Sequence, residues 1–182
     1  PTALPTARLA TSLAPASAPD QSTLAAFETG FKEGQDLMDQ GQPAAAARRW
    51  KTTADLLPET TVNRDMRAGI YEYIADAYTR AVTEDTSLEL VREAAGVFDA
   101  YIAGYTRAYG TETPPNPKLA ATQKDLADRR ASAEAAAQAL DDFERSAWGQ
   151  RYPTVTAAWR RAWDRVIPFF TFPPEVRRVV YT

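Results

Sequence analysis

Apolar side chains recur every three or four residues over most of the first 110 positions of the chain. This period is that of an amphipathic α-helix with one face in a core. The pattern is interrupted at turn-forming residues, at Gly41, Pro58 and Gly110. It therefore predicts an all-α fold, with helices over residues 22–40, 43–57, 63–81 and 86–109.

Two of these helices begin at residues whose side chains can accept hydrogen bonds from free backbone N–H groups. Asn63 stands at the N-cap of the third helix, and Thr86 with Glu89 forms a capping box at the fourth. The predicted core face of the third helix carries Met66, Ile70, Ile74, Ala77 and Ala81. The four helices are thus expected to form two antiparallel pairs.

Small and large residues are spaced along the first pair in a way that lets two helices approach closely. The positions concerned are Gly34, Gly41, Ala46, Trp50 and Pro58. This spacing resembles a tetratricopeptide repeat, although Gly30 and Glu33 stand where that family has large apolar residues. The resemblance implies a repeat-like scaffold over about residues 22–110 that binds a protein partner. Since such arrays need about three repeats, the following helix should complete the core.

Proline-rich segments divide the remainder of the chain. Residues 1–21 contain four prolines and no sustained periodicity, so a disordered leader is expected. Residues 111–117 contain three prolines and predict a turn. From Pro117 onward about thirty residues lack a strong helix breaker, which predicts one long helix or two with an offset. The expected units are 1–21, 22–110, 111–137 and 138–182.

The last forty or so residues carry many uncommon side chains in a distinctive order. They include Trp148-Gly149, Tyr152-Pro153, Val166-Ile167-Pro168-Phe169-Phe170 and Phe172-Pro173-Pro174-Glu175. This order resembles the mutator-type transposases of bacterial insertion sequences over about residues 138–182. The junction with the preceding sequence is expected inside the long helix, near residues 130–138.

The resemblance implies a parent enzyme that cuts and joins DNA. That family uses an Asp, Asp, Glu triad on a ribonuclease-H-like fold, where the carboxylates hold divalent metals such as Mg²⁺. In the family the final Glu follows a Tyr-Thr-Thr-Asn segment, whereas this sequence stops at Tyr181 and Thr182. Nothing upstream resembles the strands that carry the two Asp residues. We therefore expect no enzyme activity, no catalytic residue, no metal and no cofactor in this chain, and at most weak DNA binding.

The residues of the C-terminal stretch also predict its structure independently of the transposase resemblance. Pro153 can open a helix, and Pro168 should limit its continuation before a short helix that runs through Val180. The expected inner face is Val155, Trp159, Trp163 and Val166, and the expected outer face is Arg160, Arg161 and Arg165. So many aromatic residues need a partner surface, which either the repeat-like helices or self-association would supply.

Composition narrows the range of functions. The 182 residues include no Cys and no His, which excludes thiol nucleophiles, His-dependent triads and Cys or His zinc sites. No apolar run approaches the twenty residues of a membrane span. The net charge of −3 is uneven, because residues 1–139 hold 14 Lys and Arg against 19 Asp and Glu, and residues 140–182 hold 7 against 5. The transposase-like stretch is therefore the positive part of the chain.

Two sets of residues are candidates for binding. The candidate DNA contacts are Arg160, Arg161, Arg165, Arg177 and Arg178. The candidates for a protein-partner groove are Tyr101, Tyr105 and Tyr109, which share a helix face and for which core packing is the alternative. A transposase origin would place the chain in the bacterial cytoplasm, and export stays open if a signal preceded Pro1.

Overall fold

The computed structural model describes residues 18–172, and within this range the protein consists of seven α-helices without any β-strand. The all-α prediction is confirmed. The helices are α1 Gln21–Asp39, α2 Pro43–Ala54, α3 Arg64–Glu84, α4 Leu88–Tyr109, α5 Pro117–Arg145, α6 Ala147–Arg151 and α7 Pro153–Thr171. Most of the expected leader, residues 1–17, and the expected helix through Val180 lie outside the described residues.

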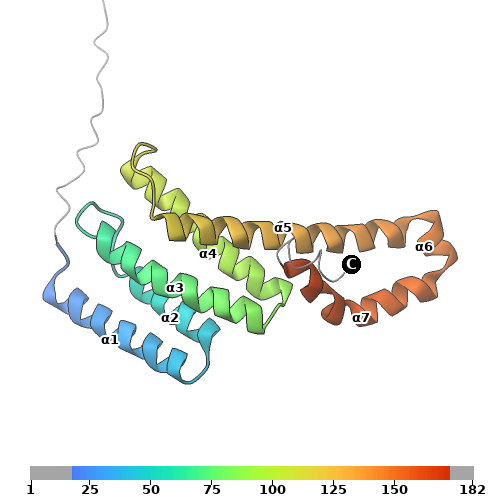
Figure 1. Cartoon of the computed structure of the whole chain (residues 1–182), viewed down its shortest axis with the longest axis horizontal. Coiled ribbons are helices and arrows are strands. Elements are labelled where there is room, and N and C mark those ends of the chain that lie inside the picture. The colour runs from blue at the N-terminus through green and yellow to red at the C-terminus, as the bar shows by residue number, and fades with distance from the viewer. Residues whose placement is uncertain (1–17, 173–182) are drawn as a thin grey trace, which may run out of the picture.

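The molecule is elongated, with two parts joined by α5 (Figure 1). Helices α1 to α4 pack side by side as a helical array, in which α2 contacts both α1 and α3. The first half of α5 lies against α4 and α3. Its second half extends beyond the array, and α6 and α7 fold back along it to form what we call the α5–α7 hairpin. Among the described helices, none has an apolar stretch long enough to cross a bilayer.

The helix starts differ in detail from the capping predictions. Asp20 caps α1, because its Oδ1 accepts a hydrogen bond of 2.7 Å from the Thr23 N–H. Ser87 rather than Thr86 caps α4, and its hydroxyl accepts from Leu90 N–H at 3.3 Å. Asn63 occupies the N-cap of α3, but its side chain instead donates to the Pro58 carbonyl at 3.0 Å.

The close approach of α1 and α2 depends on Gly34. A Cβ added at this position would lie 2.2 Å from Nε1 of Trp50, whose indole packs directly on the α1 backbone. The same nitrogen donates a hydrogen bond of 2.9 Å to the Phe31 carbonyl. The small-residue and large-residue pair noted in the sequence is thus a real helix–helix contact. It does not test the tetratricopeptide assignment itself.

The core of the array is formed by large side chains from three helices and is completed by α5. Tyr71, Tyr78 and Phe98 are almost fully buried between α3 and α4. Leu119 and Leu126 of α5 are buried against the same cluster. Burial of two leucines in this way contributes several kcal/mol, at about 1.5–3 kcal/mol for each. The first half of α5 therefore serves as the closing helix of the array.

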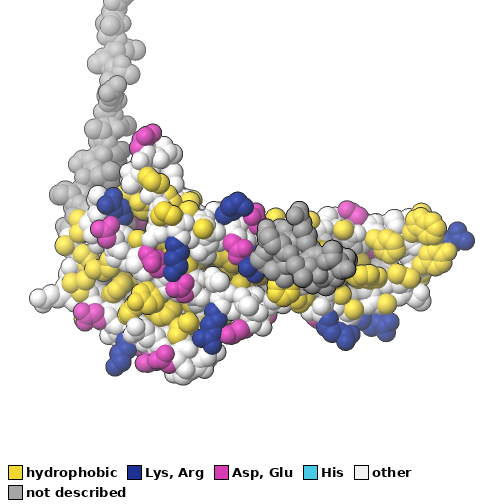
Figure 2. Space-filling model, in the orientation of Figure 1, with side chains coloured by type: hydrophobic (Ala, Val, Ile, Leu, Met, Phe, Trp, Pro, Cys, Tyr) yellow, Lys and Arg dark blue, Asp and Glu magenta, His cyan; other side chains and the backbone are white. Residues whose placement is uncertain are grey.

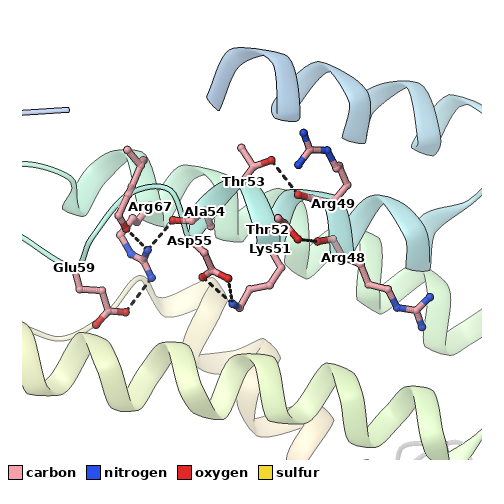
Figure 3. Close-up of polar contacts among 10 residues, drawn as sticks. Arg48, Arg49, Lys51, Thr52, Thr53, Ala54, Asp55, Glu59 and Arg67 are labelled. Carbon is pink, nitrogen blue, oxygen red and sulfur yellow. Dashed lines mark hydrogen bonds and ion pairs between the residues drawn. The ribbon is translucent and has the colours of Figure 1, made fainter. Parts of the chain in front are cut away.

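At the start of α3 the structure buries a residue other than the one that the hydrophobic pattern predicts. Met66, predicted to face inward, is 40% exposed, whereas the neighbouring Arg67 is 8% exposed. The guanidinium of Arg67 donates to the backbone carbonyls of Ala54, at 2.8 Å, and Leu57, and it pairs with Glu59 at 3.0 Å. Figure 3 shows these contacts at the C-terminal end of α2. Arg67 thus fixes the loop between α2 and α3.

The second half of the chain follows the predicted helices with one change. Residues 117–145 form a single helix rather than two. Pro168 does not end α7, which continues through it to Thr171. A proline costs a helix one N–H donor, and here it stands in the last turn, where little of the helix follows. The hydroxyl of Thr171 donates to the Pro168 carbonyl at 2.7 Å and satisfies an acceptor at the helix end.

Candidate nucleic-acid interface

A tight corner connects the two long helices of the α5–α7 hairpin. The Ser146 hydroxyl accepts from Gly149 N–H at 3.2 Å and donates to the Phe143 carbonyl at 2.6 Å. Gly149 leaves no room for a side chain, since an added Cβ would lie 2.1 Å from the Phe143 carbonyl oxygen. Pro153 then begins α7. These residues set the direction in which α7 returns along α5.

The inner face of α7 differs in part from the one that the sequence predicted. Val155 and Trp159 were expected inside, but their side chains are 42% and 47% exposed, whereas Trp163 and Val166 are half-buried. The fully buried positions are Thr156, Ile167 and Thr171. The hydrophobic pattern weighs side chains by size and polarity, so it does not detect the two buried threonines.

The exposed aromatic residues border an apolar groove between α5 and α7. The groove has a volume of about 420 Å³. Its lining residues are Ala136, Ala139, Leu140, Phe143, Trp159, Trp163 and Phe170. Because the two helices do not close over these side chains, the hairpin is less tightly packed than the array. The aromatic residues of this stretch thus have only part of the partner surface that they were expected to need.

The five candidate DNA-contacting arginines do not share one environment. Arg160 joins α7 to α5 through ion pairs with Glu144, at 2.6 Å, and Asp141. These hydrogen bonds, the one with Glu144 first, raise the pKa of the Arg160 guanidinium. Arg160 therefore stabilises the hairpin. Arg177 and Arg178 lie outside the described residues.

Arg161 and Arg165 are exposed on α7 and form no ion pair with any residue in the range 18–172. Arg161 donates to the Ala157 carbonyl of its own helix at 3.4 Å. A spacing of four residues places the two guanidinium groups on the same face of the helix. Figure 2 shows Lys and Arg side chains gathered along one edge of the hairpin, with few carboxylates among them.

The three tyrosines proposed for a partner groove lie in or next to the core of the array. Tyr101 and Tyr105 are 3% and 7% exposed, and the Tyr101 ring stacks on Tyr71 with a centroid distance of 4.0 Å. Burial raises the pKa of Tyr101 to about 12. The Tyr109 hydroxyl donates to the Thr60 carbonyl at 2.7 Å. These contacts are those of the packing role that the sequence left as the alternative, and a partner groove at the three tyrosines stays a prediction.

A partly exposed polar cluster in the array was not predicted from the sequence. Arg48 of α2 donates to both carboxylate oxygens of Glu93 in α4, each at 2.7 Å. The Tyr78 hydroxyl of α3 donates to the same carboxylate at 2.8 Å. Hydrophobic periodicity carries no signal for such a contact, because its partners are 15 and 45 residues apart. The cluster joins three helices and leaves no carboxylate oxygen for chemistry.

The described residues do not fit the metal site that the family resemblance implies. Within residues 18–172, no three Asp, Glu, His or Cys side chains converge in a way that could hold a metal ion. The carboxylates of the hairpin pair with arginines instead: Asp142 with Arg145 at 2.7 Å, and Asp141 with Arg160. No chemical step through a metal can be derived from these residues.

Comparison with known proteins finds a partial similarity that includes the hairpin. Residues 117–182 match the model of a family described as "Transposase, Mutator family". The match begins at Pro117, upstream of the boundary near residue 138 that the sequence motif predicted, and therefore includes the whole of α5. No solved structure is significantly similar to the chain.

Curated relatives agree with this partial match. A probable transposase for an ISRM3-like insertion sequence element of Sinorhizobium fredii is 52% identical over 54 residues, which cover 30% of this chain and 14% of the relative. The transposase for insertion sequence element ISRM3 of Rhizobium meliloti has the same identity and coverage. A probable insertion-sequence transposase of Corynebacterium diphtheriae is 53% identical over 49 residues, 27% of this chain and 14% of the relative. The chain thus spans about one seventh of the length of these relatives, and its C-terminal part is similar to mutator-family transposases.

Proposed function

We propose that this chain is a DNA-binding derivative of a mutator-family transposase that does not itself cut or join DNA. The α5–α7 hairpin is the DNA-contacting part, and Arg161 and Arg165 contact the phosphates. The observation that carries the proposal is the pair of exposed guanidinium groups on one face of α7, inside the segment similar to transposases. Residues 147–172 contain four Arg and one Asp, a balance of +3.

Charge bounds the strength of this binding. The whole chain is negative, at −3, so duplex DNA is attracted to the arginine-bearing edge of α7 and repelled by much of the array. Each neutralised phosphate contributes a slope of about −0.9 to the dependence of log K on log salt concentration. With a few arginines in contact, we expect a slope of roughly −2 to −4 and weak binding at physiological salt.

The test compares two double variants of the full chain in a salt titration with a duplex. Arg161→Gln with Arg165→Gln should make the slope shallower by about two, since each phosphate contact contributes about one. Arg80→Gln with Arg107→Gln removes the same charge from the exposed surface of the array and serves as the matched control. The control should change the slope little.

Two results of this titration count against the proposal. Equal effects of the two double variants would show that net charge alone drives binding. A wild-type affinity no greater than that of an unrelated protein of equal charge would remove DNA binding altogether.

The absence of catalysis is part of the proposal and has its own support. The family resemblance places the catalytic carboxylates on strands of a sheet, and residues 18–172 contain helices and loops but no strand. A labelled duplex incubated with the full chain and Mg²⁺ or Mn²⁺ is expected to stay intact. Nicked or joined products that depend on the metal would contradict this half of the proposal.

A second candidate function is binding of a protein partner by the array. It is favoured by a surface groove of about 480 Å³ between α1 and α3, beside Trp50 and the 45% exposed Tyr73. The groove also carries Asp36 and Asp39 beside Lys32, and Asp76, which pairs with Lys118 at 2.9 Å, so a partner with a few basic side chains fits it. Tyr73→Lys in the full chain should abolish capture of such a partner, whereas the arginine variants of α7 should leave it unchanged.

A further inference from the structure

The corner of the α5–α7 hairpin carries a stacked pair of exposed aromatic rings. Trp148 is 64% exposed and Tyr152 is 43% exposed. Their ring centroids are 5.8 Å apart and their planes differ by 17°, so the two rings lie nearly parallel. The Arg151 guanidinium carbon lies 5.7 Å from the centroid of the Tyr152 ring. We call these three residues the aromatic corner; Figure 1 places it at α6, at the end of the hairpin farthest from the array.

Local contacts hold the aromatic corner in place although it is exposed. The Tyr152 N–H donates to the Trp148 carbonyl at 2.9 Å, which fixes the backbone that carries the two rings. Between them, Gly149 packs against the backbone of Phe143 and Glu144 with no space for a side chain. The rings stack on each other and are not covered by other helices. Tryptophan is enriched among the residues that contribute most to binding.

The charge around the corner selects an anionic ligand. The sequence from 147 to 163 contains Arg151, Arg160 and Arg161 and no Asp or Glu. Arg160 is engaged within the hairpin, but Arg151 lies beside the exposed rings. A flat aromatic surface with an adjacent guanidinium matches a nucleotide, whose base stacks on the ring and whose phosphate contacts the cation.

We propose that the aromatic corner binds an unpaired nucleobase of DNA, with the base stacked on Trp148 and its phosphate next to Arg151. Bases in an intact duplex have both faces stacked on their neighbours, so they reach a protein ring only when they are unpaired or turned out of the helix. This inference rests on the proposed function, because Arg161 and Arg165 would hold the adjoining duplex. It adds a preference for junctions between duplex and single strand.

The experiment measures binding of the full chain to two labelled probes by fluorescence anisotropy at low salt. One probe is a 20-base-pair duplex, and the other is the same duplex with a single-stranded overhang of five thymidines. The wild type should bind the overhang probe about tenfold more tightly, which is the effect expected for one or two stacked bases. Trp148→Ala should remove this preference and leave affinity for the plain duplex unchanged.

Two further variants separate stacking from general effects. Trp148→Phe keeps a flat ring and should retain part of the preference. Tyr73→Ala removes an exposed aromatic ring from the array and should leave the preference unchanged, as the matched control. Circular dichroism of each variant verifies that its helical content is that of the wild type.

The outcomes distinguish this inference from the proposed function. If the duplex is bound but the overhang gives no gain, or the gain survives in Trp148→Ala, the inference is overturned and the proposed function stands. If neither probe is bound, both are overturned. If sedimentation shows that Trp148→Ala converts a dimer to a monomer with the overhang preference intact, the corner is a self-association surface and the inference is again overturned.

Discussion

Arg67 compensates for the polar groups that α2 leaves free where it ends. The last carbonyls of a helix have no partner within it and carry a partial negative charge. Here the carbonyls of Ala54 and Leu57 accept from the guanidinium, and Glu59 balances its charge. The Glu59 carboxylate in turn packs against Gly104 of α4, where an added Cβ would lie 2.4 Å away. A single side chain thus connects the end of α2 to α3 and α4.

Replacement of Arg67 by Met should be among the most destabilising single changes in the array. The variant keeps the apolar stem but leaves two backbone carbonyls and the Glu59 carboxylate without a donor, which costs roughly 3 kcal/mol. Urea denaturation followed by circular dichroism measures the change in free energy of unfolding. Arg80→Met on the same helix removes a half-exposed partner of Glu84 and should change stability by only about 0.5 kcal/mol. Equal effects at the two positions would contradict this role of Arg67.

Prediction from the sequence is weakest at the scale of single residues. Helical periodicity places Met66 inside α3 because it weighs side chains by hydrophobicity alone. The structure buries Arg67 instead, since its guanidinium finds carbonyls at the end of α2, and that meeting depends on tertiary packing. The same limit applies to Arg160, whose partners on α5 lie 16 and 19 residues away.

At the scale of helices, Glu93 joins α2, α3 and α4. Its carboxylate accepts from Arg48 and from the Tyr78 hydroxyl. The hydrogen bonds from Arg48 hold the pKa of Glu93 below its ordinary value, against the opposing effect of burial. Burial, together with the hydrogen bond to Glu93, raises the pKa of the Tyr78 hydroxyl.

This cluster should contribute stability that depends on pH. A carboxyl whose pKa is lower in the folded state stabilises the fold above its unfolded pKa, roughly 4.3, and loses that contribution as the pH falls through the folded value. Glu93→Gln should therefore lower the free energy of unfolding by about 1 kcal/mol at pH 7. The difference from wild type should shrink toward zero near pH 3. Urea denaturation at both pH values tests this, with Glu84→Gln as the exposed control, and a difference independent of pH would contradict it.

The order of the long helices could be predicted from the sequence, and the ends of helices less well. Periodicity and proline positions are local, so they located six of the seven helices in residues 18–172 and missed the short α6. The sequence alone could not tell whether Thr86 or Ser87 is the N-cap of α4, because both have hydroxyl groups. The backbone conformation decides between them. Pro168 was expected to limit α7, but its position in the last turn makes its cost small.

At the scale of the whole molecule, α5 belongs to both the helical array and the α5–α7 hairpin. Near its middle, α5 is tied to the array by Arg130, which pairs with Asp99 at 2.9 Å, and by Glu134, which pairs with Arg92 at 2.8 Å. Farther along, Asp141 and Glu144 pair with Arg160 of α7, and α7 also contacts α4. The direction of the hairpin relative to the array therefore depends on the helix between these two sets of ion pairs and on the contact of α7 with α4.

A proline in this shared region should bend the molecule without unfolding its array. Ala135→Pro places the ring on an exposed side of α5 between the two sets of ion pairs, removes one backbone hydrogen bond and costs about 3 kcal/mol. Small-angle X-ray scattering should show a change in the longest dimension of the particle. Ala135→Gly, which costs about 1 kcal/mol without a ring, should leave the scattering profile unchanged. An unchanged profile for the proline variant would mean that contacts outside α5 fix the hairpin.

The length of α5 can also be expressed as a number of base pairs along a DNA duplex. A helix of 29 residues measures about 44 Å, at about 1.5 Å per residue. Successive base pairs rise by about 3.4 Å, so this span equals roughly 13 base pairs, more than one full turn of the duplex. If α5 lay along the duplex axis, a nucleotide bound at Trp148 would be more than one turn away from the base pairs next to the Pro117 end of the helix. A partner bound to the array would then act on a neighbouring turn of the same duplex.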